Sequence, residues 1–202
     1  MVADEVITGF GRLGTRFGIE RWKVVPDMIA FAKGVTSGYL PLGGVIVKES
    51  VYQTLVDAGP DFALHHGFTY SGHPTVCAAA LANLDIIERE QLIARVRKLA
   101  PHFKRRLDAL LHHDIVGEVR TAGLMGAIEL VRDKMSKEPL PGEWNVPARI
   151  RAAALARGVI IRSSVDTVVV CPPLIITREE IDVIAATIDA AIAEVSGALG
   201  TR

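Results

Sequence analysis

Several features that mark particular classes of protein are scarce in this 202-residue sequence. It has only two cysteines, Cys77 and Cys171, which do not suggest a disulfide framework. Its 23 basic and 23 acidic residues give a net charge of zero, so nothing favours nucleic acid or an anionic membrane as a partner. No apolar run reaches the roughly 18 residues of a membrane-spanning helix. The composition is therefore that of an ordinary globular protein.

The sequence also lacks internal repeats, low-complexity tracts and a signal peptide at its start. The missing signal peptide predicts a cytoplasmic protein. Half of the residues are hydrophobic, and they are interrupted by glycine, proline and charge. A length of 202 residues fits one large or two small domains.

Lys33 is the most informative residue, because it follows the apolar, strand-like part of residues 26–34. A lysine there reaches the carboxyl edge of a strand, where α/β sheets place their ligands. If desolvation lowers its pKa, its amine can form a Schiff base with a carbonyl. Asp4 ends an earlier apolar stub in the same way and would pair with a protonated pyridine nitrogen. The ordinary alternative for Lys33 is a solvated lysine at the start of a loop. For Asp4, which is next to Glu5, it is a loop or helix-capping acid.

A third motif, residues 65–74, runs directly into a helix-like segment. Ser71 is a plausible N-cap and Pro74 a plausible early helical residue. Backbone amides at a helix start, with the hydroxyl of Thr69 nearby, could bind an anion such as a phosphate. Glycine- and serine-rich helix entrances are common, so this motif gains meaning only together with Asp4 and Lys33.

The histidines raise the alternative of a metal site. His65 and His66 are adjacent, and no cysteine or carboxylate lies at ligand spacing from them. His112 and His113 occur in a separate region, where a predicted helix passes into a loop. We therefore expect no metal site.

The sequences of these motifs resemble those of the class III pyridoxal-phosphate aminotransferases. Among these enzymes, the strings SGYLP and TYSGHP are most similar to the omega-transaminases, which move amino groups between amines or omega-amino acids and pyruvate. The resemblance covers nearly the whole chain in matching order, through residues 3–12, 31–43, 67–74, 159–162 and 171–177.

The resemblance implies roles for individual residues. Lys33 matches the lysine that bonds to pyridoxal 5'-phosphate and carries a proton, and Asp4 matches the partner of the pyridine nitrogen. Thr69, with the backbone around Phe68, matches a phosphate-binding position supplied by the neighbouring subunit of a homodimer. Arg162 matches a mobile arginine that binds a substrate carboxylate through two hydrogen bonds. From charge placement alone, Arg162 also fits a surface arginine between two short strands.

The resemblance further implies an α/β protein of PLP-transferase fold type I. Residues 1–90 would be the C-terminal part of the large cofactor-binding domain, and residues 91–202 the small C-terminal α/β domain. Family chains are more than twice as long, and their part before Asp4 holds the phosphate loop and the aromatic residue that stacks on the cofactor. Residues 1–3 are also shorter than a usual strand of about five or six residues.

We therefore expect a C-terminal fragment that binds pyridoxal phosphate poorly and is inactive alone. Its substrates, as part of an enzyme, would be small amines and 2-oxo acids. The alternatives are a non-catalytic remnant that retains only the fold and an interface, and a racemase, aminomutase or decarboxylase of the same superfamily. The amine donor and the stereoselectivity do not follow from the sequence.

Hydrophobic periodicity predicts the secondary structure that carries the motifs. Strands 28–31 and 44–47 are separated by too few residues for a helical crossover, so we expect them to be antiparallel neighbours. Thr177 and Glu180 form a capping-box pattern before the last helix, and residues 181, 184, 185, 188 and 191 form its core-facing stripe. The other expected elements are helices at 49–57, 74–90, 91–111 and 148–157, strands at 115–120, 124–131, around 162 and at 167–171, and a loop at 139–147.

Overall fold

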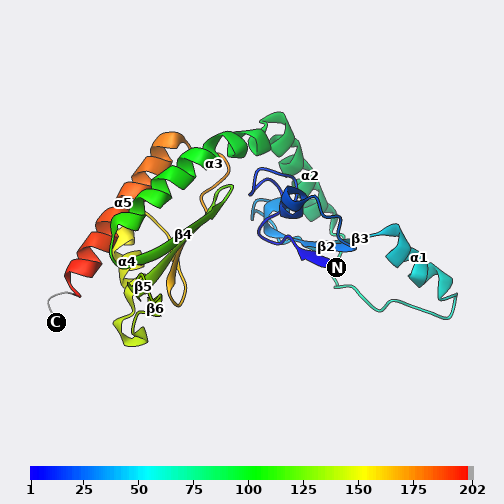
Figure 1. Cartoon of the computed structure of the whole chain (residues 1–202). Coiled ribbons are helices and arrows are strands. Elements are labelled where there is room, and N and C mark those ends of the chain that lie inside the picture. Colours follow the sequence, from blue (N-terminus) through cyan, green and yellow to red (C-terminus); the bar gives the residue numbers. More distant parts are fainter. Residues whose placement is uncertain (200–202) are drawn as a thin grey trace. The chain divides into compact units, whose positions relative to one another are not determined.

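The computed structural model describes residues 1–199 and divides into two compact units, residues 1–94 and residues 95–202. Each unit contains its own β-sheet with helices beside it (Figure 1). None of the described helices is both long and apolar enough to cross a membrane.

The sheet of the first unit has three strands in the order β1-β2-β3. Strand β1 (Val2–Asp4) is parallel to β2 (Met28–Phe31), with Asp4 opposite Ala30. Strand β3 (Gly44–Val47) pairs with β2 in antiparallel register, which confirms the predicted pairing. Because β1 and β2 are parallel, their carboxyl ends lie at the same edge of the sheet.

Four helical segments belong to the first unit. They are the 3-10 helices η1 (Gly18–Trp22) and η2 (Lys33–Val35) and the α-helices α1 (Glu49–Asp57) and α2 (Pro74–Arg89). The two predicted α-helices are confirmed, and Pro74 is the first residue of α2. The prediction that Ser71 caps α2 is wrong, since the N-cap residue is His73. The Ser71 hydroxyl instead accepts a 2.7 Å hydrogen bond from the backbone N–H of Phe68, within the preceding turn.

The second unit is built on an antiparallel sheet in the order β4-β5-β8-β7, with the short β6 also paired to β5. The bounds are β4 Val116–Ala122, β5 Met125–Asp133, β6 Glu138–Pro139, β7 Arg162–Ser163 and β8 Thr167–Val170. All four predicted strands are present. Strand β6 was missed, because its two residues lie where proline and glycine predict a loop.

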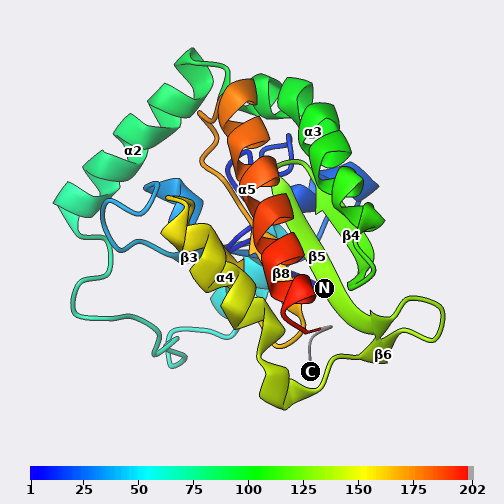
Figure 2. The same ribbon diagram turned by 90° about the vertical axis from the view of Figure 1, so that its left-hand side faces the viewer.

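Helices α3 (Leu92–Asp108), α4 (Val146–Ala156) and α5 (Arg178–Gly197) accompany this sheet, and α4 and α5 lie side by side (Figure 2). Helix α3 packs directly on β5, because a Cβ added at Gly126 would lie 2.3 Å from Cδ1 of Leu107. Phe103, Leu107, Ile128, Ile150 and Ile188 are among the fully buried side chains of this core.

Two short 3-10 helices, η3 (Ala109–His112) and η4 (Gly142–Trp144), complete the unit. Helix η4 and the start of α4 correct the expected loop at 139–147. Helix α4 begins two residues earlier than predicted, because Pro147 is tolerated in the first helical turn, where its missing N–H needs no partner.

Helix α5 confirms its sequence prediction closely. The hydroxyl of Thr177 accepts a hydrogen bond from Glu180 N, and the Glu180 carboxylate accepts one from Thr177 N, at 3.1 and 2.8 Å. The predicted apolar stripe faces the core: residues 181, 185, 188 and 191 are 0 to 2% exposed, and Ile184 packs against them partly buried.

Candidate active site

The parallel pairing of β1 and β2 brings Asp4 and Lys33 to the same edge of the first sheet. Asp4 is the last residue of β1, and Lys33 follows the end of β2 by two residues. One carboxylate oxygen of Asp4 accepts a 3.1 Å hydrogen bond from the backbone N–H of Val6, and both side chains are exposed. An anion and an amine are therefore presented together where parallel strands end, the usual ligand edge of such sheets.

Lys33 has an unusual backbone conformation. Its φ is +44°, in the left-handed region, and it opens the 3-10 helix η2 directly after the extended Ala32. A residue other than glycine in this region carries strain of about 1 to 3 kcal/mol and is often found at functional sites. The carbonyl of Lys33 accepts backbone hydrogen bonds from Thr36 and Gly38, which fix the turn.

The side chain of Asn83, on α2, forms hydrogen bonds with this turn. Its Nδ2 donates to the carbonyl oxygens of Gly34 and Val35 at 2.9 and 3.0 Å. Its Oδ1 accepts a 2.7 Å hydrogen bond from the hydroxyl of Ser37. Sequence reasoning missed Asn83, although its spacing from the buried Ala80 and Ile87 places it on the inward face of the helix.

Glu5 organises the loop that follows Asp4. Its carboxylate is 3% exposed and accepts 2.7 Å hydrogen bonds from the backbone N–H groups of Gly18 and Ile19, and a further one from the hydroxyl of Thr8. Hydrogen bonds to a carboxylate are stronger than neutral ones, so Glu5 ties residues 5–19 together beside Asp4. Sequence reasoning noted Glu5 only as a neighbour of Asp4. Its role was missed, because its backbone partners lie 13 and 14 residues away.

The proposed phosphate-binding residues lie apart from this arrangement in the described chain. Thr69 and Phe68 belong to an exposed segment before α2, and the Phe68 side chain is 79% exposed. Within residues 1–199, no hydrogen bond or ion pair joins Thr69 to Asp4 or Lys33. Their role in binding phosphate stays a prediction.

Arg162 belongs to the second unit. It is the first residue of β7, lies in register opposite Val169 and has an exposed side chain. An exposed guanidinium on a two-residue strand is available to a carboxylate ligand. Its part in substrate binding also stays a prediction.

The order of these elements and motifs has counterparts among known proteins. Residues 1–192 match the family described as aminotransferase class-III. The chain belongs to the class III aminotransferase family. The sequence resemblance is thereby confirmed at the level of the family.

Solved structures of transaminases share the fold of this class III chain. An (S)-enantioselective omega-transaminase from Thermomicrobium roseum is 47% identical with a TM-score of 0.91, over 96% of this chain and 43% of that one. An amine transaminase from an uncultivated Pseudomonas species, in its PLP-bound form, is 41% identical with a TM-score of 0.91, over 96% and 44%. The fold is therefore fold type I of the PLP-dependent transaminases, as expected.

A curated relative, the putrescine–pyruvate aminotransferase of Pseudomonas aeruginosa, is 41% identical over 182 residues. The match covers 90% of this chain and 39% of the relative. The chain thus spans less than half the length of the curated relatives that it matches.

Asp4 and Lys33 carry the two groups that pyridoxal phosphate requires. A pyridinium nitrogen requires an anionic partner, and the cofactor aldehyde requires an amine. Asp4 and Lys33 supply these groups from adjacent strand ends, and both are exposed and so accessible to a ligand. Asp4 would therefore face the ring nitrogen, and Lys33 would hold the cofactor covalently.

Proposed function

We propose that the complete gene product containing these residues is a pyridoxal-phosphate-dependent transaminase. It transfers an amino group between an amine or omega-amino acid and a 2-oxo acid such as pyruvate. The observation that supports this most strongly is the placement of Asp4 and the strained Lys33 at one edge of the β1-β2 pair. The names of the similar omega-transaminase and putrescine–pyruvate aminotransferase support the choice of substrates.

Two side chains do the acid–base work in this proposal. When bound, pyridoxal phosphate supplies an electron sink for the negative charge that a departing proton leaves on the substrate carbon. Asp4 keeps the ring nitrogen protonated by presenting a carboxylate that Val6 N–H orients. Once the substrate amine has replaced it at the cofactor, Lys33 would be a free amine that accepts the proton of the substrate carbon at Nζ and donates it to a second carbon.

The remaining roles concern binding. Thr69 and the backbone around Phe68 bind the phosphate from the neighbouring subunit of a homodimer, and Arg162 binds the substrate carboxylate. Residues 1–90 act as part of the cofactor-binding domain and residues 91–202 as the small domain. A cytoplasmic location belongs to the same proposal.

An amino-transfer assay tests the function. The complete gene product should form alanine from pyruvate with at least one amine or omega-amino acid donor. Lys33→Ala should lower kcat by about 10²- to 10⁴-fold or more, the usual contribution of a general base, while the circular dichroism spectrum is retained.

Lys48→Ala is the matched control. Lys48 Nζ donates a 2.8 Å hydrogen bond to Asp27, and this ammonium group, together with the N-terminal amine of Met1, lowers the pKa of the Asp27 carboxyl to about 2. Lys48 is therefore a charged, paired lysine, and its loss should leave turnover nearly unchanged. Absence of transfer from every donor, or full activity of Lys33→Ala, would contradict the proposed function and favour a non-catalytic remnant.

A further inference from the structure

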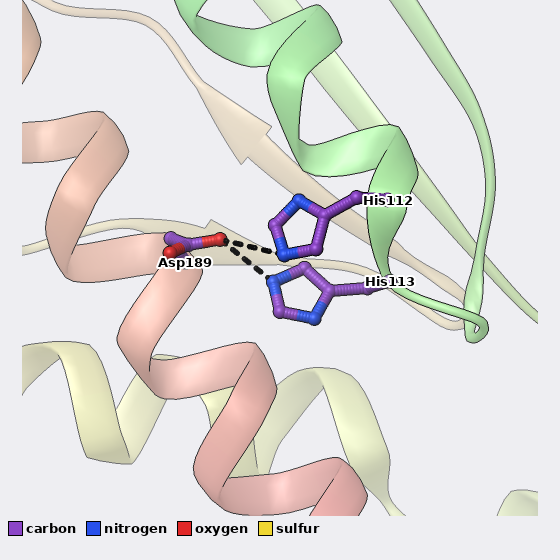
Figure 3. Close-up of side chains that lie close together, drawn as sticks. All are labelled: His112, His113 and Asp189. Atoms are coloured by element: carbon purple, nitrogen blue, oxygen red, sulfur yellow. Dashed lines mark hydrogen bonds and ion pairs between the residues drawn. The ribbon is translucent and has the colours of Figure 1, made fainter.

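Three side chains of types that bind metal ions lie close together in the second unit. His112 ends η3, His113 follows it, and Asp189 lies on α5 (Figure 3). Nε2 of His113 is 2.8 Å from Oδ1 of Asp189, and Nε2 of His112 is 3.4 Å from the same oxygen. One ligand atom from each residue lies within 4.8 Å of the other two.

The hydrogen bonding of His112 defines its tautomer. Nδ1 of His112 lies 2.8 Å from the carbonyl oxygen of Ala109, which can only accept, so Nδ1 carries the proton. In the neutral ring, Nε2 then presents a lone pair toward Asp189, whose carboxylate oxygen is also an acceptor (Figure 3). A lone pair beside a carboxylate oxygen is an arrangement that either a proton or a metal ion can bridge. Metal-binding histidines are typically fixed in this way, by a carbonyl on the opposite ring nitrogen.

We propose that His112, His113 and Asp189 form a binding site for Zn²⁺. Zinc binds imidazole nitrogen and carboxylate oxygen at about 2.0 to 2.2 Å, which places tetrahedral ligand atoms about 3.4 Å apart. The 3.4 Å separation between His112 Nε2 and Asp189 Oδ1 matches this spacing, whereas the 2.8 Å hydrogen bond between His113 Nε2 and Asp189 Oδ1 would have to lengthen when the ion binds. Water would complete the coordination, since the His112 side chain is 62% exposed.

A second histidine–aspartate pair provides a contrast. His102 Nε2 on α3 lies 2.8 Å from Asp182 Oδ1 on α5, the helix that also carries Asp189. Arg106 also lies 2.9 Å from that oxygen and supplies a permanent cation. Within residues 1–199, the ion pairs of Asp189 are instead with His112 and His113. The carboxylate of Asp189 is therefore the one whose neutralisation depends on a proton or a metal ion.

This proposal departs from the expectation of no metal, because the fold brings together residues that are distant in the sequence. Asp189 is 76 residues from His113 in sequence, so no local ligand spacing could reveal it. A bound ion would join the end of η3 to the middle of α5. Its main consequence would be a more stable second unit.

Zinc titration of the tag-free 202-residue chain tests the proposal. Calorimetry should show one equivalent of Zn²⁺ bound, and the thermal midpoint should rise with Zn²⁺ concentration, because an ion that binds only the folded state stabilises it. Co²⁺ should give visible d–d absorption at the same stoichiometry. Affinity should fall at acidic pH, because protons compete with the metal ion for its ligands.

Variants separate this site from other zinc ligands, and circular dichroism verifies their folding. His113→Ala and the nearly isosteric Asp189→Asn should each weaken Zn²⁺ binding by more than about tenfold. His102→Ala should bind as the parent does. Absence of stoichiometric binding by the parent chain would overturn the proposal. So would binding that survives both site variants, which would indicate ligands such as the two cysteines.

Discussion

Lys33 combines a reactive side chain with a strained backbone. The left-handed φ of +44° is held by backbone hydrogen bonds from Thr36 and Gly38 to the Lys33 carbonyl. The side chain of Asn83 also donates to the carbonyls of the two residues that follow Lys33. We infer that the strain serves to aim the amine, in the way that functional sites often store strain.

Arg162 carries the prediction about substrate choice at the residue scale. In the complete gene product, Arg162→Ala should lower kcat/KM for pyruvate and alanine. The loss should correspond to about 2 to 5 kcal/mol of binding free energy, the usual effect of truncating one partner of a charge pair that the ligand desolvates. An amine donor without a carboxylate should be affected far less. The exposed Arg151 of α4 offers a control, because Arg151→Ala should spare both substrate types. Equal losses for both types in Arg162→Ala would mean that Arg162 is structural.

Single residues could be proposed for the site where their chemistry lies within a short motif. Asp4 and Lys33 were proposed because each lies at or just after the end of an apolar strand, and their roles stay predictions. Asn83 and Glu5 were missed, because their importance comes from partners 49 and 13 residues away. A side chain whose role depends on such distant backbone groups has no local signature in one sequence.

At the scale of elements, the junction between η2 and α2 determines how Lys33 is held. Asn83→Ala should remove two donated hydrogen bonds and leave two carbonyls without them, at a cost of about 1 to 3 kcal/mol in stability. In the complete gene product, it should also lower kcat about tenfold and shift the pH profile of kcat, because Lys33 moves a proton. Denaturant unfolding and the pH profile provide the two readouts.

Two variants sharpen this prediction. Asn83→Asp keeps the size and the acceptor for Ser37 but loses both donors, so it should behave like Asn83→Ala. Ser37→Ala removes only the hydroxyl contact and should have a smaller effect. A loss of stability with an unchanged pH profile would show that Asn83 acts on folding alone.

Most elements could be predicted, because burial imposes clear periodicity on them. The stripe of α5 and its capping box are the best example, since both signals are local. The errors concerned a helix cap and a two-residue strand, where contacts beyond the local sequence decide the structure. Ser71 forms a hydrogen bond within its own turn instead of capping α2. Strand β6 forms by pairing with β5, and its proline gives no local sign of a strand.

At the scale of the whole molecule, the first unit exposes much of its apolar surface. Val45 and Ile46 of β3 are 55 and 48% exposed, and Tyr39, Phe68 and Tyr70 are 79 to 86% exposed. Exposed apolar surface of this extent is typical of protein interfaces. It supports the homodimer of the proposed function, and the weak pyridoxal phosphate binding expected of the chain alone stays a prediction.

We propose that Lys33 is the residue that bonds to the cofactor. The complete gene product can be incubated with pyridoxal phosphate, reduced with borohydride and analysed by peptide mapping. We expect stoichiometric label on Lys33 and none in Lys33→Ala. Label on Lys23 or Lys48, or unchanged labelling of the Lys33→Ala variant, would contradict it.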